Sequence, residues 1–164
     1  MVLNDVKQGF ASLWDSVSEG WQRVRQSAAG ALIRFMPGEH STLPGKAEVD
    51  DDFYFPSQGW ALLGGDVFED ERRVVARVEI PGMRKDEIAI EVTDEALVLS
   101  GEKRFERESA ESRYRVLQCA YGTFKRVDPL ATRVLPDQAS PTYTEGVLKV
   151  VLPKATPGKP SSHT

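Results

Sequence analysis

The side chains that most often carry enzyme chemistry are few in this chain and lie far apart in the sequence. There are two histidines, His40 beside a stretch rich in Pro and Gly and His163 near the C-terminus, and one cysteine, Cys119. Catalysis by a nucleophile or by a general acid and base requires such groups to be held together, and neither histidine lies in a regular element. We therefore assign no catalytic residue and predict that the protein is not an enzyme.

Motifs that bind phosphate or metal ions are also missing from the sequence. It contains no GxxxxGK[ST] phosphate loop, no Cys-x-x-Cys pair and no histidine pair at helical spacing. Three adjacent acids, Asp50, Asp51 and Asp52, suggest a cation site, but acid runs in irregular segments are usually solvated. The sequence therefore predicts neither a cofactor nor a metal site.

The composition indicates one domain with flanking segments. With 164 residues, 40% of them hydrophobic and 28% charged, the chain can build a single core but hardly two. A net charge of −4 and the lack of a basic tract argue against nucleic acid as a partner. The lone cysteine, the lack of a signal-peptide pattern and the lack of an apolar run of about 20 residues predict a cytoplasmic protein.

Apolar residues in the first part of the chain recur at intervals of three and four, which predicts an amphipathic helical arm over residues 1–37. The apolar stripe continues as far as Phe35. Gly20 and Gly30 each weaken a helix interior by about 1 kcal/mol relative to alanine, which favours two or three shorter helices over one rod. A Pro-Gly pair ends the pattern, and an irregular tether is predicted over residues 38–65.

From residue 66 onward the period of the hydrophobic pattern changes to two. Short alternating runs, separated by turn residues such as Pro81-Gly82, predict six or more strands with no helix between them. This pattern predicts an antiparallel all-β sandwich over residues 66–154. The tail, residues 155–164, has little apolar content and is expected to be disordered.

A charged stretch between two predicted strands is too long for a tight hairpin. It lies between Gly101 and Arg113. It forms either a solvated loop or a further strand that pairs with the sheet edge of another chain, and the residues alone leave both interpretations open. The residues of such an exchange strand would be Arg104, Phe105, Glu106 and Arg107.

Five motifs follow one another in register over the β region. They are Asp66–Glu69, Val78–Ile88, Leu97–Arg104, Tyr121–Arg126 and Gly146–Lys154. In this order they resemble the opening strand and the PGxxKxDI, LxIxGER, YGxFxR and GVL…LPK motifs of the small heat-shock protein (alpha-crystallin) family, bacterial type. The positions that carry the motifs are Pro81, Gly82, Gly101, Gly122, Phe124, Arg126, Gly146 and Leu148.

The resemblance implies an immunoglobulin-like β-sandwich, the alpha-crystallin domain, and a stress-response chaperone. Such a holdase binds unfolding proteins without ATP and prevents their aggregation under heat or other stress. The resemblance also implies dimers made by exchange of Arg104–Arg107, larger homo-oligomers, and ATP-dependent disaggregases or refolding chaperones downstream. Apolar contacts contribute about 25 cal/mol per Å² and add up over several subunits.

Candidate client-binding residues come from the stripe of the arm and from an aromatic cluster in the tether. They are Phe10, Leu13, Trp14, Val17, Trp21, Val24, Leu32, Phe35, Phe53, Tyr54, Phe55 and Trp60. If the arm binds clients, deletion of residues 1–37 should leave a folded β domain that suppresses aggregation weakly. Alternatively, the stripe packs on the sandwich or on a second copy, as amphipathic helices usually do.

Two other functions remain as alternatives for the whole protein. A dedicated protein-interaction or co-chaperone module would use the same sandwich with one fixed partner. Binding to a membrane surface would use the amphipathic arm, but the roughly balanced charges of the arm disfavour anionic lipid.

Three features depart from the family's pattern. Gln118 and Cys119 replace a Glu-Arg pair, so a dimer salt bridge that depends on that arginine is not expected. Pro141 replaces an alanine, and because proline cannot donate to a β ladder, it disfavours an ordinary paired strand there. Residues 155–164 lack the Ile-x-Ile/Val motif that joins dimers in the family, so we expect small or loosely held assemblies.

Overall fold

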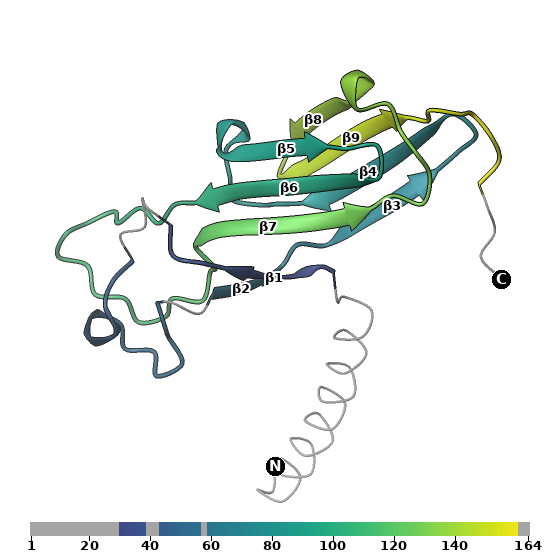
Figure 1. Ribbon diagram of the computed structural model, residues 1–164. Helices are drawn as coiled ribbons and strands as arrows, with labels where there is room; N and C mark the ends of the chain where they lie inside the picture. The colour runs from purple at the N-terminus through teal and green to yellow at the C-terminus, as the bar shows by residue number, and fades with distance from the viewer. Residues whose placement is uncertain (1–29, 39–42, 57–58, 161–164) are drawn as a thin grey trace, which may run out of the picture.

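The computed structural model describes residues 30–38, 43–56 and 59–160. This part of the chain forms nine strands and three single-turn 3-10 helices (Figure 1). The strands are β1 (Leu32–Phe35), β2 (Gly59–Leu62), β3 (Gly65–Glu69), β4 (Arg73–Glu79), β5 (Ile88–Val92), β6 (Ala96–Lys103), β7 (Gly122–Pro129), β8 (Ser140–Thr144) and β9 (Val147–Pro153). The short helices are η1 (Lys46–Glu48), η2 (Lys85–Glu87) and η3 (Pro136–Gln138).

Two antiparallel sheets, β3-β4-β9-β8 and β5-β6-β7, make up the main body of the molecule. They lie one behind the other in Figure 1. Alternate residues of the inner strands enter the shared core, among them Val78 of β4, Leu99 of β6 and Leu152 of β9. The strand period of two is therefore the cause of the layered core, and the predicted all-β sandwich is confirmed.

The longest ladder of the four-stranded sheet joins β4 to β9, from Arg73 opposite Pro153 to Glu79 opposite Val147. A two-residue turn then links β8 to β9. Both of its residues, Glu145 (φ 54°) and Gly146 (φ 77°), have the positive φ that such a hairpin requires. Gly146, the glycine of the GVL motif, thus allows the tight turn between β8 and β9.

The predicted helix is wrong at its C-terminal end, because Leu32–Phe35 is strand β1. This strand pairs with β2, which lies inside the tether that was predicted to be irregular. Ile33 and Phe35 point into the main core, and the Phe35 and Phe124 rings lie 5.3 Å apart. Over four residues the apolar pattern fits a strand as well as a helix, and burial favours the strand. The remaining arm, residues 1–29, lies outside the described residues.

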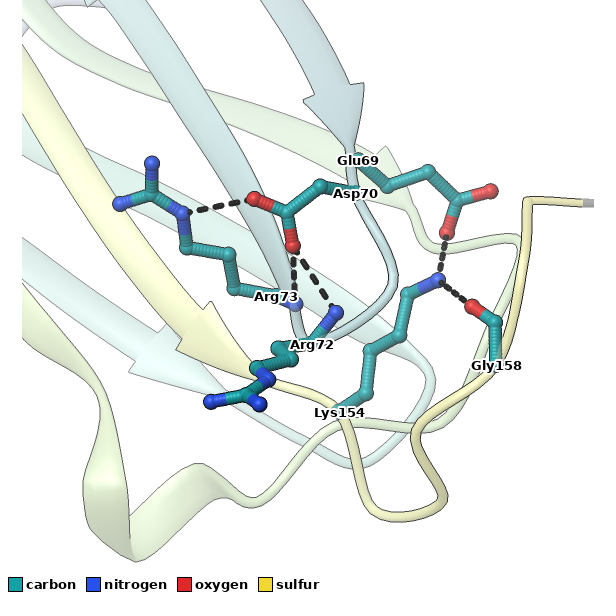
Figure 2. Close-up of polar contacts among 6 residues, drawn as sticks. All are labelled: Glu69, Asp70, Arg72, Arg73, Lys154 and Gly158. Atoms are coloured by element: carbon teal, nitrogen blue, oxygen red, sulfur yellow. Dashed lines mark hydrogen bonds and ion pairs between the residues drawn. The ribbon is translucent and has the colours of Figure 1, made fainter.

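The start of the predicted disordered tail is ordered. Figure 2 shows Lys154 reaching from the end of β9 to the carboxylate of Glu69 and to the carbonyl of Gly158. The ammonium of Lys154 lies 3.1 Å from Glu69 Oε2, and its side chain is almost completely buried. The amide of Gly158 donates to the carbonyl of Glu71 (2.8 Å). The prediction for residues 155–164 is therefore wrong at least as far as Gly158.

Pro141 does not prevent strand pairing. It lies in β8 opposite Val150 of β9, and β8 is paired over its whole length. β8 is the last strand of its sheet, and an edge strand accepts proline because one of its sides needs no ladder. The expectation that Pro141 disfavours a paired strand is therefore wrong.

Candidate functional site

Two segments that are far apart in the sequence pack on each other beside the sandwich. They are residues 43–56, here called the tether segment, and residues 104–121 between β6 and β7, here called the loop (Figure 1). Val49 forms a parallel bridge with Tyr114, and the amide of Asp50 donates to the carbonyl of Tyr114 (2.9 Å). The tether segment and the loop thus form one unit, which we call the clamp.

Aromatic rings form a small core inside the clamp. Phe105 is only 6% exposed, and its ring makes T-shaped contacts with the rings of Tyr114 (centroids 5.4 Å apart) and Tyr121 (5.2 Å). Tyr54 is buried on the tether side, where its hydroxyl donates to the carbonyl of Pro44 (2.7 Å). The predicted exchange residue Phe105 therefore packs within its own chain in this structure.

Ion pairs join the acidic tether segment to the basic loop. Glu48 lies 3.2 Å from Arg107, and Asp50 accepts hydrogen bonds from Arg113 (Nε to Oδ1, 2.8 Å) and from Arg115. The hydrogen bonds from the two arginines hold the pKa of Asp50 below its usual value. The pKa of Glu48 is also lowered, first by the hydrogen bond from the Gly45 amide and then by Arg107. Both carboxylates are therefore charged at neutral pH.

An open hollow of about 400 Å³ lies where the tether segment meets the end of the loop. Phe53, Phe55 and Trp60 line it from one side, and Leu117 and Cys119 line it from the other. Phe53 is 90% exposed, and Phe55 and Trp60 are each 54% exposed. Exposed aromatic rings around a hollow form an apolar surface, and binding of an apolar partner there is favourable because it removes this surface from water. We call this surface the aromatic hollow.

The predicted client-binding residues differ in how exposed they are in the structure. All four tether aromatics line the aromatic hollow, but the side chain of Tyr54 is buried whereas the other three are exposed. Phe35 is also buried, so its prediction as an exposed contact is wrong because β1 belongs to the core. Leu32 is partly buried. Six candidates lie outside the described residues, namely Phe10, Leu13, Trp14, Val17, Trp21 and Val24.

Sequence reasoning missed the loop side of the aromatic hollow. Leu117 and Cys119 line it, although the alternation of residues 114–117 predicted one more short strand, which the structure does not form, and Cys119 only a departure from a family motif. Leu117 was the available signal, because an apolar residue beside a charged stretch is a candidate for packing. Leu117 and Phe53 line the same hollow although they lie far apart in the sequence, which no local pattern encodes.

Two sheet edges offer further surfaces. β3 has a neighbour on one side only, and its Val67 and Phe68 side chains are 46% and 45% exposed. On the opposite side, a groove of about 90 Å³ between β5 and β8 is lined by Ile88, Ile90 and Pro141. Arg104–Arg107 is not a strand within this single chain, so its exchange with another chain stays a prediction.

The motif residues serve the architecture of the sandwich. Arg126 is 5% exposed and forms a two-point pair with Asp128, with both N–O distances 2.9 Å, while it also donates to the carbonyl of Leu63. It thereby fixes the link between β2 and β3 to β7. At Gly122 (φ 118°) a Cβ atom would lie 2.0 Å from the carbonyl oxygen of Met36, so only glycine allows β1 to approach.

Among residues 30–38, 43–56 and 59–160, no three His, Cys, Asp or Glu side chains are placed to hold a metal ion. In the same ranges, no helix has the length and apolar character needed to cross a membrane. Both histidines lie outside them.

The Hsp20/alpha crystallin family model matches residues 66–164, which is more than half of the chain. The 17.6 kDa class I heat shock protein 1 of Arabidopsis thaliana is 29% identical over 123 residues, which cover 71% of this chain and 79% of the relative. The 18.1 kDa class I heat shock protein of the same plant is 34% identical over 87 residues, which cover 52% of this chain and 54% of the relative. The chain thus spans only about half of the second relative.

Solved structures share the sandwich. Heat shock protein 16.0 from Schizosaccharomyces pombe aligns with a TM-score of 0.55 at 28% identity, over 62% of this chain and 94% of that one. A small heat-shock protein from Xylella fastidiosa aligns with a TM-score of 0.51 at 22% identity, over 63% of this chain and 95% of that one, which is a likeness of fold alone. The bacterial type stays a prediction, because the two similar curated proteins quoted above come from a plant.

Proposed function

The chain belongs to the Hsp20/alpha crystallin family, and from this premise we propose that it is a molecular chaperone of the holdase type. It binds partly unfolded proteins through apolar surface, without ATP and without any catalytic step, and keeps them from aggregating under heat or other stress. A cytoplasmic location and release of clients to ATP-dependent disaggregases or refolding chaperones belong to the same proposal.

The observation that carries this proposal is the aromatic hollow. Phe53, Phe55 and Trp60 are large apolar side chains that remain exposed to water in the folded chain. Each Å² of apolar surface removed from water contributes about 25 cal/mol, so three such rings supply a contact that is weak alone and useful when several subunits act together. Such a surface selects clients by exposed apolar area rather than by shape.

Self-association is the second part of the proposal. The open edge of β3 presents unpaired backbone groups flanked by Val67 and Phe68, and a strand from a second copy would satisfy them. We propose that Arg104–Arg107 of the partner supplies this strand. We further propose that assemblies beyond the dimer are small or loosely held. Light scattering that showed one large shell of fixed size would contradict this.

The arm contributes further client contacts in this proposal, through Phe10, Trp14, Trp21 and their apolar neighbours. The truncation that tests it must respect the core. Deletion of residues 1–29 leaves β1 in place, whereas deletion of residues 1–37 removes Ile33 and Phe35 from the core.

The test of the function is suppression of the thermal aggregation of an unrelated enzyme, without nucleotide, at rising ratios of this protein. Suppression that saturates at a stoichiometric ratio is the expected result. A folded protein that suppresses nothing at any ratio would contradict the holdase and favour a module with one dedicated partner.

A further inference from the structure

We propose that Lys154 is a positioning residue for self-association: its buried pair with Glu69 holds the end of β3 in place, so that the open edge of this strand can accept a strand from a second copy. The inference rests on the proposed self-association and names a residue on which it depends. Lys154 follows β9, and β4 lies between β9 and β3, so Lys154 acts on the open edge through Glu69.

Strand β3 has little apolar burial to hold it against the sandwich. It pairs with β4 over five positions, but four of its five residues are exposed, and none belongs to the main core. The exposed Val67 and Phe68 flank the backbone groups that a joining strand would pair with. A strand that keeps its apolar side chains free for a partner has to be held by other contacts.

The period of the strands places Lys154 and Glu69 on the core face of the sheet. Glu69 lies opposite Val74, and Val74 lies opposite Leu152, so these three side chains share one face. Lys154 follows Leu152 by two residues and continues on that face. Val74 and Leu152 both belong to the main core. The ion pair therefore closes the end of the core.

The segment that follows Lys154 encloses the ion pair. The side chain of Lys154 is only 3% exposed, and its ammonium lies 3.1 Å from Oε2 of Glu69 and donates to the carbonyl of Gly158 (3.0 Å; Figure 2). The amide of Gly158 in turn donates to the carbonyl of Glu71 (2.8 Å). Residues 154–158, here called the C-terminal strap, thus join the β3–β4 turn to the end of β9.

The β3–β4 turn has a second brace of a different kind. Oδ1 of Asp70 accepts hydrogen bonds from the amides of Arg72 and Arg73 (both 2.9 Å), and its Oδ2 accepts one from Nε of Arg73 (3.0 Å; Figure 2). The side chains of Asp70 and Arg73 are about half exposed. These contacts lie within the turn, whereas the pair of Lys154 with Glu69 connects the turn to the core face of the sheet.

Loss of the Lys154 ammonium would leave the carboxylate of Glu69 without its counter-charge. Its Oε2 is buried, and a buried carboxylate that has lost its partner is stabilised by moving into water. Because β3 is an edge strand, its end can leave the sheet while β4 and β9 stay paired. An edge that is ordered in only a fraction of the molecules binds more weakly, since the apparent dissociation constant rises by the inverse of that fraction.

The test is a double-mutant cycle in the full chain. Lys154→Met removes the charge and keeps a long side chain, Glu69→Met removes the other partner, and the double variant replaces the ion pair by two apolar side chains, which a core face tolerates. Lys149→Met is the matched control, because it makes the same change on the opposite face of β9. Sedimentation velocity over a dilution series gives the dissociation constant of the dimer, and hydrogen exchange reports the order of each strand.

We expect Lys154→Met to raise the dissociation constant by about tenfold, which corresponds to a β3 end that is in place in about a tenth of the molecules. Hydrogen exchange should become faster in β3, with β6 and β7 unchanged. Glu69→Met should act in the same direction, and it decides the matter if Lys154→Met does not fold. The double variant should return both readouts toward the wild type, and Lys149→Met should leave them unchanged.

Four outcomes would overturn the inference. They are an unchanged dissociation constant in the single variants, an equal effect of Lys149→Met, faster exchange in all strands alike, and a double variant that dimerises no better than the single ones. The third would mean that Lys154 holds the whole sandwich, and the fourth that Glu69 touches the partner itself. A wild type that stays monomeric at every concentration would instead contradict the proposed self-association, and with it the role of Lys154.

Discussion

The sandwich and the clamp are stabilised by different forces. In the sandwich, alternating apolar residues of β4, β6 and β9 fill the core, and the buried charges of Arg126 and Lys154 are paired with Asp128 and Glu69. In the clamp, a few rings and a set of exposed ion pairs hold two segments together. The buried core makes the sandwich the more stable region, whereas the exposed ion pairs of the clamp are screened by water and salt. In the proposed function, the sandwich supports the aromatic hollow, which binds clients.

The largest effect expected is that of the two truncations, which define where the framework begins. Removal of residues 1–29 should leave the free energy of unfolding nearly unchanged. Removal of residues 1–37 also deletes β1, and loss of a buried phenylalanine alone costs about 3–5 kcal/mol. Denaturant unfolding of both truncated chains measures the difference. Equal stability of the two would show that Ile33 and Phe35 are not part of the core.

A smaller effect is expected when one tyrosine hydroxyl is removed from the clamp and, separately, one from the sandwich. Tyr54→Phe and Tyr143→Phe each remove a hydroxyl that donates to backbone carbonyls, that of Pro44 in the clamp and those of Ile80 and Met83 in the sandwich. Each loss should cost about 1 kcal/mol.

The two variants should differ in which region of the protein is destabilised. Tyr143→Phe should lower the midpoint of global unfolding, whereas Tyr54→Phe should only speed hydrogen exchange in the clamp. A fall in the global midpoint for Tyr54→Phe would mean that clamp and sandwich unfold as one unit.

Acid should act on the clamp before it acts on the sandwich. The pKa values of Glu48 and Asp50 are lowered in the folded protein, so their ion pairs stabilise it above the ordinary carboxyl pKa, and this is lost as the pH falls through the lowered values. As the pH falls below about 4, the ordinary carboxyl range, NMR signals of the clamp should shift first. Asp70, whose pKa is lowered in the β3–β4 turn, is the internal control, because a ladder holds that turn.

The smallest effect on stability is expected for the aromatic hollow. Replacement of Phe53, Phe55 and Trp60 by serine should change the free energy of unfolding by about 0.5 kcal/mol or less per site, because the rings are already exposed. Suppression of aggregation should nevertheless fall. Val116→Ser, which alters a 60% exposed residue outside the hollow, is the control. Undiminished suppression by the triple variant would exclude the hollow as a client site.

The two regions also differ in how far the sequence predicts them. The period of two from residue 66 onward predicts the sandwich, because each strand's burial pattern is local. The contact of Asp50 with Arg113 joins residues 63 positions apart and follows no period. The sequence therefore indicated an acid run and a charged loop but not that they bind each other.

Some local errors had the same origin. Leu32–Phe35 is too short for its periodicity to separate helix from strand, and its burial under β7 decides the outcome. Pro141 was judged without knowledge that β8 is an edge strand. Tyr54 was grouped with its exposed neighbours because aromatic type alone does not tell which ring faces inward.

The most direct test of the account is to map where a bound client protects this protein from hydrogen exchange. Complexes formed with a heat-unfolded model enzyme would be compared with the free protein. The account predicts protection in residues 53–56, 59–62 and 114–121, around the aromatic hollow, with β4 and β9 unchanged. Protection confined to the groove of β5 and β8, with none at the hollow, would contradict it.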